Sequence, residues 1–334
     1  MVAGGTVTAA IEVDGLRKSF RSRAVTVEAV RGITFAVPGG TVFGLLGPNG
    51  AGKTTTLRML TTLLPIDGGT ATVAGVDVAR QPATVRQRIG YVSQAGGADD
   101  LATGRENLRL QGALYGAARG QLEGRVAELV ERLDLSPFAD RRVRTYSGGQ
   151  RRRLDVALGL VHRPQVLFLD EPTTGLDPQN RAHLWEHVRS LADDGTTVVL
   201  TTHYLEEADA LCDQVVIVDH GQVVAEGTPE ALKREVVGES LSLTVRDPGR
   251  LDDALGAVQA VDGVLDGTID GAEVRLRVGD GSAVLPAVLG MLQARGVDVE
   301  SVNLARPSLD DVFLARTGRS LRDAGGPRAE VAGE

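Results

Sequence analysis

One glycine-rich segment carries the clearest chemistry in this sequence. Gly47-Pro-Asn-Gly-Ala-Gly-Lys-Thr54 stands between a predicted strand and a predicted helix. Successive backbone amides of such a loop can curl around phosphate oxygens, and the following helix points its positive end at them. Lys53 can reach the β- and γ-phosphates, and the Thr54 hydroxyl can bind Mg²⁺. The segment therefore predicts a nucleotide-binding P-loop, and the lack of a guanine-reading Asn-Lys-x-Asp segment disfavours a GTPase.

A second segment suits metal binding and water activation. Val166-Leu-Phe-Leu169 is continuously apolar, and Asp170 and Glu171 follow it. Ligands of open α/β sheets bind at the carboxyl ends of strands, so Asp170 can hold Mg²⁺ directly or through water. Glu171 points to the other side and can polarise an attacking water. The alternative is a strand end capped by two solvated acids, which the following Pro-Thr-Thr-Gly-Leu-Asp177 disfavours.

A third segment can bind a second anion. Tyr146-Ser-Gly-Gly-Gln150 opens a predicted helix that runs to about Val161. A hydroxyl, two unhindered glycine amides and a helix N-terminus together form an anion-binding surface. A chain with a P-loop needs only one phosphate cradle, so this surface is expected to serve a neighbour's nucleotide. The alternative is an ordinary serine N-cap with a Gly-Gly turn.

The elements that must position these residues are those of an α/β domain. Unbroken Val/Leu/Ile runs predict strands covered on both faces. The predicted strands span 33–37, 41–46, 166–170, 197–201 and 214–219, and a helix is expected over 54–64. Between Thr103 and Tyr146 the strand signal gives way to helical spacing, as in Val126, Leu129 and Leu133. We expect one domain over 11–236, with a helical subdomain at about 95–160.

A smaller domain is predicted after a boundary near 236–240. Strands at 240–245, 263–266, 273–278 and 297–304 alternate with helices at 251–258 and 283–295. The order β-α-β-β-α-β predicts a ferredoxin-like α+β domain within 240–320. A last helix is expected to begin at Ser308 as N-cap, with Asp311 three residues on. Residues 1–10 are predicted to be flexible and 321–334 disordered.

Composition narrows the possible functions. The 334 residues are 42% apolar, enough for a sizeable core, and the net charge of −8 argues against nucleic-acid binding. A single cysteine, Cys212, excludes a disulfide framework. No apolar run approaches the length of a membrane span, so we expect any work at a membrane to be done from outside the bilayer.

Taken in order, the motifs resemble those of the ATP-binding subunit of ABC transporters. The match runs from about Ile11 to Leu232. It comprises the Walker A motif at 47–54, the Q-loop at Gln94 and the signature at 147–150. The Walker B motif at 166–170, the D-loop at 175–177 and the switch histidine at His203 complete it. The resemblance implies a P-loop NTPase of the ABC ATPase type that uses ATP and Mg²⁺.

The resemblance also implies a role for each matched residue. It makes Glu171 the general base, while His203 contacts the γ-phosphate and Gln94 contacts the metal and senses the membrane partner. Thr54, Gln94 and Asp170 form the implied metal set. Ser147 and Gly149 are implied to bind the γ-phosphate of the opposite subunit, and Asp177 to link the two sites. The implied ATP-binding set is Phe20, which would stack on adenine, with Gly47, Pro48, Asn49, Gly50, Ala51, Gly52, Lys53, Thr54, Thr55, Ser147, Gly148, Gly149, Gln150 and Asp177.

Several segments resemble one branch of that family, the daunorubicin/doxorubicin-resistance type. They are Gly90 to Gln94, Thr103 to Leu108, Tyr146 to Asp155, and the terminal Leu309-Asp-Asp-Val-Phe-Leu314. One motif set per chain, with half a composite site each, predicts a homodimer with two ATP at composite sites. The likeness implies a separate ABC-2-type membrane permease subunit, and export of a drug-like or antibiotic compound from the cytoplasmic face of the cell membrane.

Other functions remain open at this stage. The same motor can export lipid, polysaccharide or peptide, because the missing membrane subunit chooses the cargo. A non-transport soluble ABC ATPase acting on ribosomes or DNA usually has two motif sets or a long coiled-coil insertion, and this sequence has neither. A drug-sequestering or regulatory protein would need a ligand pocket within 240–304, where the sequence has no aromatic residue.

Overall fold

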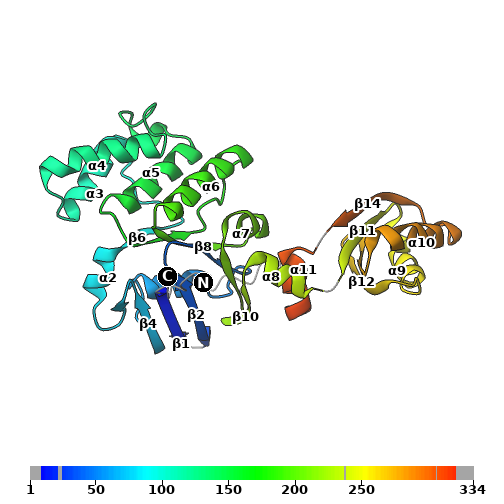
Figure 1. The fold of residues 1–334 in the computed structure, drawn as a ribbon. Helices are drawn as coiled ribbons and strands as arrows, with labels where there is room; N and C mark the ends of the chain where they lie inside the picture. Colours follow the sequence, from blue (N-terminus) through cyan, green and yellow to red (C-terminus); the bar gives the residue numbers. More distant parts are fainter. Residues whose placement is uncertain (1–8, 22–24, 237, 306, 321–334) are drawn as a thin grey trace, which may run out of the picture. The chain divides into compact units, whose positions relative to one another are not determined.

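The computed structural model describes residues 9–21, 25–236, 238–305 and 307–320. They form two compact units, one ending at Pro229 and the other running from Glu230 to Ser320 (Figure 1). The sequence predicts the boundary later, beyond helix α8 (Pro229–Glu235). An ion pair of 2.7 Å between Glu235 and Arg316 of α11 (Leu309–Thr317) ties this helix to the second unit.

Both ends of the chain, residues 1–10 and 321–334, were predicted to lack a fixed structure. The expected flexible residues 1–8 and the expected disordered tail 321–334 lie outside the described residues. Ala9 and Ala10 already belong to strand β1 (Ala9–Arg21), where Ala9 pairs with Pro38. The predicted lead-in of ten residues therefore overlaps the first strand.

A six-stranded sheet forms the centre of the first unit, in the order β10-β9-β3-β8-β7-β6. Every pairing is parallel except that of β10 with β9. The strands are β3 (Val42–Leu46), β6 (Ile89–Val92), β7 (Val166–Asp170), β8 (Thr197–Thr202), β9 (Gln214–Asp219) and β10 (Gln222–Gly227). Every residue of β3, β7 and β8 is buried. The doubly covered strands predicted at 166–170, 197–201 and 214–219 are confirmed. Residues 33–37 instead alternate between buried and exposed.

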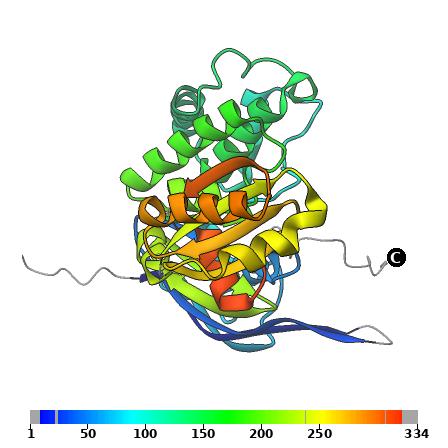
Figure 2. The same cartoon turned by 90° about the vertical axis from the view of Figure 1, so that its right-hand side faces the viewer.

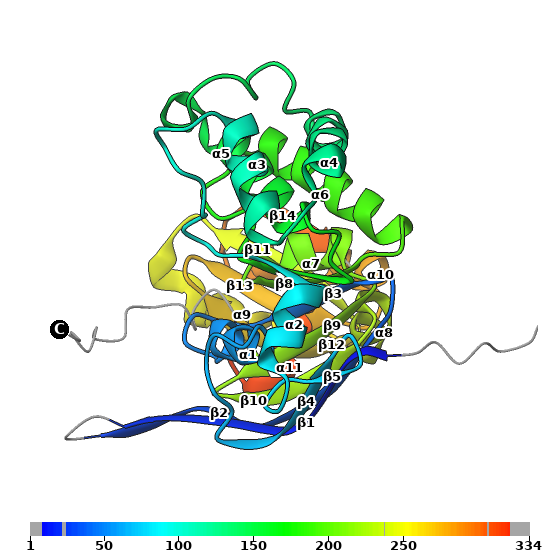
Figure 3. The same cartoon turned by 90° about the vertical axis from the view of Figure 1, so that its left-hand side faces the viewer.

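A second, antiparallel sheet covers one side of this core, in the order β2-β1-β4-β5. Its other strands are β2 (Thr26–Pro38), β4 (Gly68–Val73) and β5 (Val76–Asp77). Helix α1 (Lys53–Leu60) contacts both sheets, and its Leu57 and Met59 share one apolar cluster with Phe35 of β2 and Phe168 of β7. Figure 3 shows the β1–β2 ribbon in blue, running out past the rest of its sheet.

Helices α5 (Gly148–Leu160), α6 (Pro178–Asp193) and α7 (Leu205–Leu211) cover the opposite side of the parallel sheet. Helix α2 (Pro82–Arg88) lies instead with α1, because its Val85 belongs to the same apolar cluster. Two further helices are α3 (Gly104–Leu114) and α4 (Arg119–Arg132). Helices α3, α4 and α5 pack on one another and form the expected helical subdomain (Figure 1). Val126, Leu129 and Leu133 are buried there, as their spacing predicts. Helix α3 begins at Thr103, whose side chain and that of Glu106 complete a capping box.

The second unit contains the predicted ferredoxin-like domain. Its strands are β11 (Glu239–Val245), β12 (Val264–Asp270), β13 (Glu273–Val278) and β14 (Val299–Ala305), and its helices are α9 (Leu251–Val258) and α10 (Gly281–Ala294). The strand order is β12-β13-β11-β14, and every pairing is antiparallel. Figure 2 shows α9 in yellow and α10 in orange lying on one face of the sheet. Helix α11 follows Ser308, which caps it with Asp311 as predicted.

Two glycines allow β6 and α5 to approach closely, and this contact can be tested. A Cβ added at Gly90 would lie 2.2 Å from the carbonyl oxygen of Gly159. We expect Gly90→Ala to lower the free energy of unfolding by about 1–3 kcal/mol through overpacking. Gly124→Ala, exposed in the middle of α4 with open space around it, is expected to raise it by about 0.5–1 kcal/mol. Urea unfolding followed by Trp185 fluorescence measures both, and equal effects would contradict the close packing.

Candidate active site

Four neighbouring strands of the parallel sheet end at the same edge. Their order is β3-β8-β7-β6. Parallel strands share one carboxyl edge, so the residues that follow each strand lie beside one another. The glycine-rich loop from Gly47 follows β3, and His203 follows β8. Asp170 ends β7 with Glu171 after it, and Gln94 follows β6. Sheet order alone thus brings together residues from four distant parts of the sequence.

The glycine-rich loop is shaped by close backbone contacts. Gly47 has φ +155° and Gly52 has φ +108°. A Cβ at Gly47 would lie 2.2 Å from the Val218 carbonyl oxygen, and one at Gly52 would lie 2.5 Å from that of Ala29. Only glycine fits at these two positions. Pro48 and Ala51 are buried, whereas Asn49 and Gly50 are exposed at the tip of the loop.

Lys53 is folded onto its own loop. Its ammonium group donates to the carbonyl oxygens of Gly47 at 2.6 Å and Pro48 at 3.0 Å. Burial lowers the pKa of Lys53, while the nearby carboxylates of Glu171 and Asp170 act in the opposite direction. Thr54 and Thr55 are half-buried in the first turn of α1. The P-loop therefore presents a cation, two hydroxyls and a helix N-terminus to the same edge of the sheet.

Two of the three residues expected to hold Mg²⁺, Thr54 and Asp170, meet at the end of β7, whereas the third, Gln94, bonds to Glu171. The carboxylate of Asp170 accepts hydrogen bonds from Thr54 Oγ1 at 3.1 Å and from Thr201 Oγ1 at 2.7 Å. Hard oxygen donors of this kind are what Mg²⁺ prefers, together with phosphate oxygens and water. No group of three or more His, Cys, Asp and Glu side chains suited to a metal occurs among the described residues. The donor set therefore fits an ion bound mainly through nucleotide phosphates.

Glu171 is the best connected acid of the site. It adopts a positive φ of 45°, and its backbone N–H donates to Thr201 Oγ1 at 3.0 Å. Its carboxylate accepts from Gln94 Nε2 at 3.3 Å and lies 3.5 Å from His203 Nδ1. The adjacent His203 ring lowers the pKa of Glu171, against the opposing effect of partial burial. The structure thus joins Gln94, Glu171 and His203, the three residues implied to be catalytic.

The signature segment forms a separate surface at the N-terminus of α5. Ser147 caps this helix, and its side chain and that of Gln150 form a capping box. Gly148 is exposed, whereas Gly149 is buried against Asn180, whose Oδ1 would lie 2.2 Å from an added Cβ. Among the described residues, no hydrogen bond joins 147–150 to the P-loop of the same chain.

Asp177 is placed next to this surface. It is the N-cap of α6, and its carboxylate accepts from the Asn180 amide nitrogens, at 2.9 Å from the backbone and 2.6 Å from the side chain. These hydrogen bonds lower the pKa of Asp177. Through Asn180, the D-loop therefore contacts the buried glycine of the signature.

Phe20 lies on the surface of the β1–β2 ribbon. It is 43% exposed and pairs across the ribbon with Val27, which is 54% exposed. The Lys18 ammonium lies 5.8 Å from the centre of its ring. An exposed aromatic face flanked by an apolar neighbour suits stacking against a planar base, and it does not suit core packing.

Sequence reasoning missed two residues that hold this site together. Thr201 bonds to both Asp170 and the backbone of Glu171. Arg152 of α5 is buried and donates to backbone carbonyls on either side of Glu171. The position of Thr201 at the end of a predicted strand was a usable signal, whereas Arg152 reads as one of three successive arginines.

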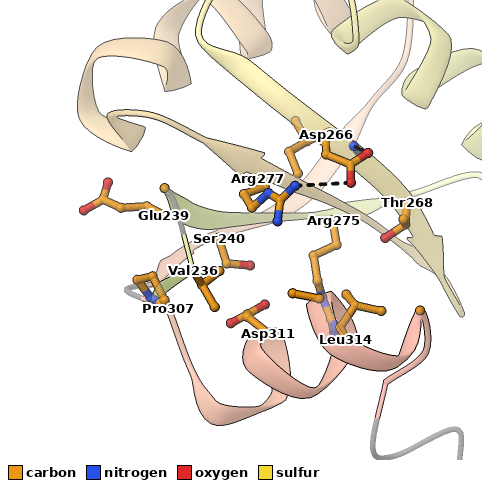
Figure 4. A pocket seen from close by; sticks show the side chains of 15 residues that line it. Val236, Glu239, Ser240, Asp266, Thr268, Arg275, Arg277, Pro307, Asp311 and Leu314 are labelled. Carbon is orange, nitrogen blue, oxygen red and sulfur yellow. Dashed lines mark hydrogen bonds and ion pairs between the residues drawn. The ribbon is translucent and has the colours of Figure 1, made fainter. Parts of the chain in front are cut away.

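A cavity of about 360 Å³ lies in the second unit, between the sheet and α11 (Figure 4). Its floor carries Arg275 and Arg277 of β13, and its other wall includes Leu314 of α11. Arg275 is ion-paired with Asp270 at 2.7 Å, and Arg277 with Asp266 at 3.6 Å. Both cations therefore lie beside carboxylates of the same domain.

Fold and site together define an ABC-type ATPase, and comparisons with known proteins agree. The sequence matches the ABC transporter family over residues 30–174 and the C-terminal domain of DrrA1-3-like ATP-binding proteins over residues 227–317. It is 47% identical to the daunorubicin resistance ATP-binding protein DrrA2 of Streptomyces coeruleorubidus, over 92% of this chain and 95% of that protein. It is 42% identical to the doxorubicin resistance ATP-binding protein DrrA of Mycobacterium tuberculosis strain H37Rv, over 92% and 93%. The chain belongs to the DrrA-type ATP-binding subunits of ABC transporters, and is thus an ATP-hydrolysing transporter subunit.

Solved structures agree on the fold of the first unit. A structure described as the ATP-binding subunit of an ABC transporter is 29% identical, with a TM-score of 0.60, covering 68% of this chain and 93% of that one. The dimeric cassette MJ0796 bound to ADP and Pi has the same TM-score of 0.60 at 23% identity, covering 65% and 98%. The predicted fold class is confirmed.

Proposed function

We propose that two copies of this chain bind two ATP molecules between them and drive export through a separate membrane protein. The observation that carries the proposal is the second anion-binding surface at Ser147–Gln150, which makes no hydrogen bond to the P-loop of its own chain within the described ranges. Two-fold pairing would place each such surface against the partner's P-loop and complete both sites. The structurally similar cassette MJ0796 is described as a dimer, which supports this arrangement.

Each side chain would then have a defined task. Lys53 and the P-loop amides bind the phosphates, and Phe20 stacks on adenine. Thr54, Asp170 and Gln94 would hold Mg²⁺, which neutralises phosphate charge when bound. Glu171 accepts the proton of the attacking water, His203 contacts the γ-phosphate, and Ser147 and Gly149 bind that phosphate from the partner side.

A membrane partner is proposed because the chain belongs to the ATP-binding subunits of ABC transporters. No helix within the described ranges is long and apolar enough to cross a bilayer. We place the contact on 94–107 and the neighbouring face of α3, where Leu101, Leu110 and Leu114 are 69%, 56% and 72% exposed. Exposed leucines on one subdomain suit a protein interface. The partner would be an ABC-2-type permease, with this subunit at the cytoplasmic face of the membrane.

The proposed cargo is a drug-like or antibiotic compound. Relatives named for daunorubicin, doxorubicin and linearmycin resistance support this class. A relative 41% identical over 94% of this chain and 99% of its own length is named as a Nod factor export protein of Paraburkholderia xenovorans. This relative supports a second candidate function, in which the same ATPase drives the export of a different class of compound.

The proposed base can be tested by removing its charge. Glu171→Gln is expected to bind ATP normally, to lose steady-state hydrolysis by about a hundredfold or more, and to accumulate an ATP-bound dimer. Phosphate release and size-exclusion chromatography measure the two effects. Near-normal turnover would remove Glu171 from the role of base.

Shared sites can be tested by mixing two inactive variants. A Lys53→Ala chain and a Ser147→Arg chain damage opposite halves of the composite site. Their heterodimer would contain one intact site, so mixing is expected to restore hydrolysis to about a quarter of the normal rate if chains pair at random and sites fire independently. Either variant hydrolysing ATP normally when dilute would contradict the proposal.

The pH dependence of hydrolysis can test the Glu171–His203 pair. Glu171 must be ionised, and its pKa lies below the ordinary 4.5, so activity is expected to fall only when the pH drops through that lowered value. His203→Asn removes the main cause of the lowering, so the acid limb of the kcat profile should move to higher pH. His187→Asn, on α6, is the control and should leave the limb in place. An unmoved limb in His203→Asn would contradict the pairing.

A further inference from the structure

Arg152 is a buried arginine that donates three hydrogen bonds to backbone carbonyls. It lies in the second turn of α5 and is 7% exposed. Its Nη1 donates to Ser93 O at 2.7 Å, its Nη2 to Asp170 O at 3.0 Å and its Nε to Pro172 O at 2.8 Å. Three donors of one planar group thus hold two separate loops.

Those carbonyls flank the residues at which hydrolysis is proposed to occur. Ser93 immediately precedes Gln94, and Asp170 and Pro172 stand on either side of Glu171. The side chains of Gln94 and Glu171 meet at 3.3 Å between these anchored backbones. The guanidinium therefore sets the spacing of the two loops whose side chains form that hydrogen bond.

The same helix holds the rest of the loop after Gln94. Asp155, one turn along from Arg152, accepts from the backbone N–H of Gly97 at 3.0 Å. Arg151 forms an ion pair of 2.6 Å with Asp100. Because Ser147 caps this helix, the surface proposed to touch the partner's nucleotide and the anchors of the catalytic loops belong to one rigid element.

We propose that Arg152 is a positioning residue for hydrolysis, coupling the signature helix to the placement of Gln94 and Glu171. This inference rests on the proposed catalytic roles of those two residues. When α5 moves toward or away from a partner's nucleotide, Arg152 moves the backbones of both loops with it. Displacement of a reacting group by about 1 Å is enough to lower a rate by about a hundredfold, so such coupling can switch hydrolysis.

The test compares Arg152→Lys with a matched control in the full-length chain. Lysine keeps the positive charge but lacks the planar guanidinium group, so it cannot donate to three carbonyl oxygens arranged in one plane. We expect kcat for Mg-ATP to fall about ten- to a hundredfold, while KM and the dissociation constant for ATP change by less than about twofold. Arg125→Lys is the control, because Arg125 donates to Leu160 O at 2.6 Å and Val161 O at 3.3 Å, at the far end of α5.

The outcomes separate a positioning role from a structural one. If Arg152→Lys lowers kcat while its melting temperature changes no more than that of Arg125→Lys, the proposal is supported. If both variants keep a normal kcat, or if kcat falls equally in both, Arg152 has no special role. If Glu171→Gln hydrolyses ATP normally, the proposed base fails. A normal kcat in Arg152→Lys alongside an inactive Glu171→Gln overturns only the present inference.

Combining substitutions gives a second measure. If Arg152 acts by placing Gln94, then Arg152→Lys should lower kcat by much less in a Gln94→Ala background than in the wild type. If the double variant loses activity by the product of the two single losses, Arg152 and Gln94 act independently, and the coupling through Gln94 is overturned.

Discussion

Parallel pairing of β3, β8, β7 and β6 is the constraint on which the site depends. It places four loops along one edge of a sheet, so that residues as distant in sequence as Lys53 and His203 face the same space. A parallel sheet is stable only when both of its faces are covered. The apolar cluster around α1 covers one face, and helices α5 and α6 lie on the other. The buried core therefore fixes the relative positions of the strand ends that carry the site residues.

The same geometry explains why one chain is proposed to be incomplete. The P-loop and Glu171 lie at the edge of the sheet, but Ser147 caps a helix of the helical subdomain and makes no hydrogen bond to that edge among the described residues. A nucleotide bound at the P-loop would meet cations and hydroxyls on one side only. In the proposed dimer, a second copy related by a two-fold axis would supply the missing side of both sites, and hydrolysis would then depend on closure.

Motifs of short range were predictable from sequence, and contacts between distant segments were not. The strand at 166–170, the helix after Ser308 and the ferredoxin-like order follow from local periodicity and capping chemistry, and all are present. Of the long β1–β2 ribbon only residues 33–37 were predicted as a strand, although Phe20 on β1 was also singled out, because register shifts interrupt the spacing of its apolar positions. Arg152 was missed because three successive arginines read as a solvated face. Only the folded backbone shows that the middle one points inward to carbonyls.

Those three arginines clarify how α5 can act as a link. Arg151 reaches Asp100 in the loop after Gln94, Arg152 reaches the carbonyls beside Glu171, and Arg153 lies over the ring of Phe138 in the helical subdomain. Consecutive positions of a helix point about 100° apart, so one turn can address three different neighbours. A flexible loop with the same three side chains would not hold them in three fixed directions. In the proposed coupling, the helix that follows the signature would carry one displacement to several loops at once.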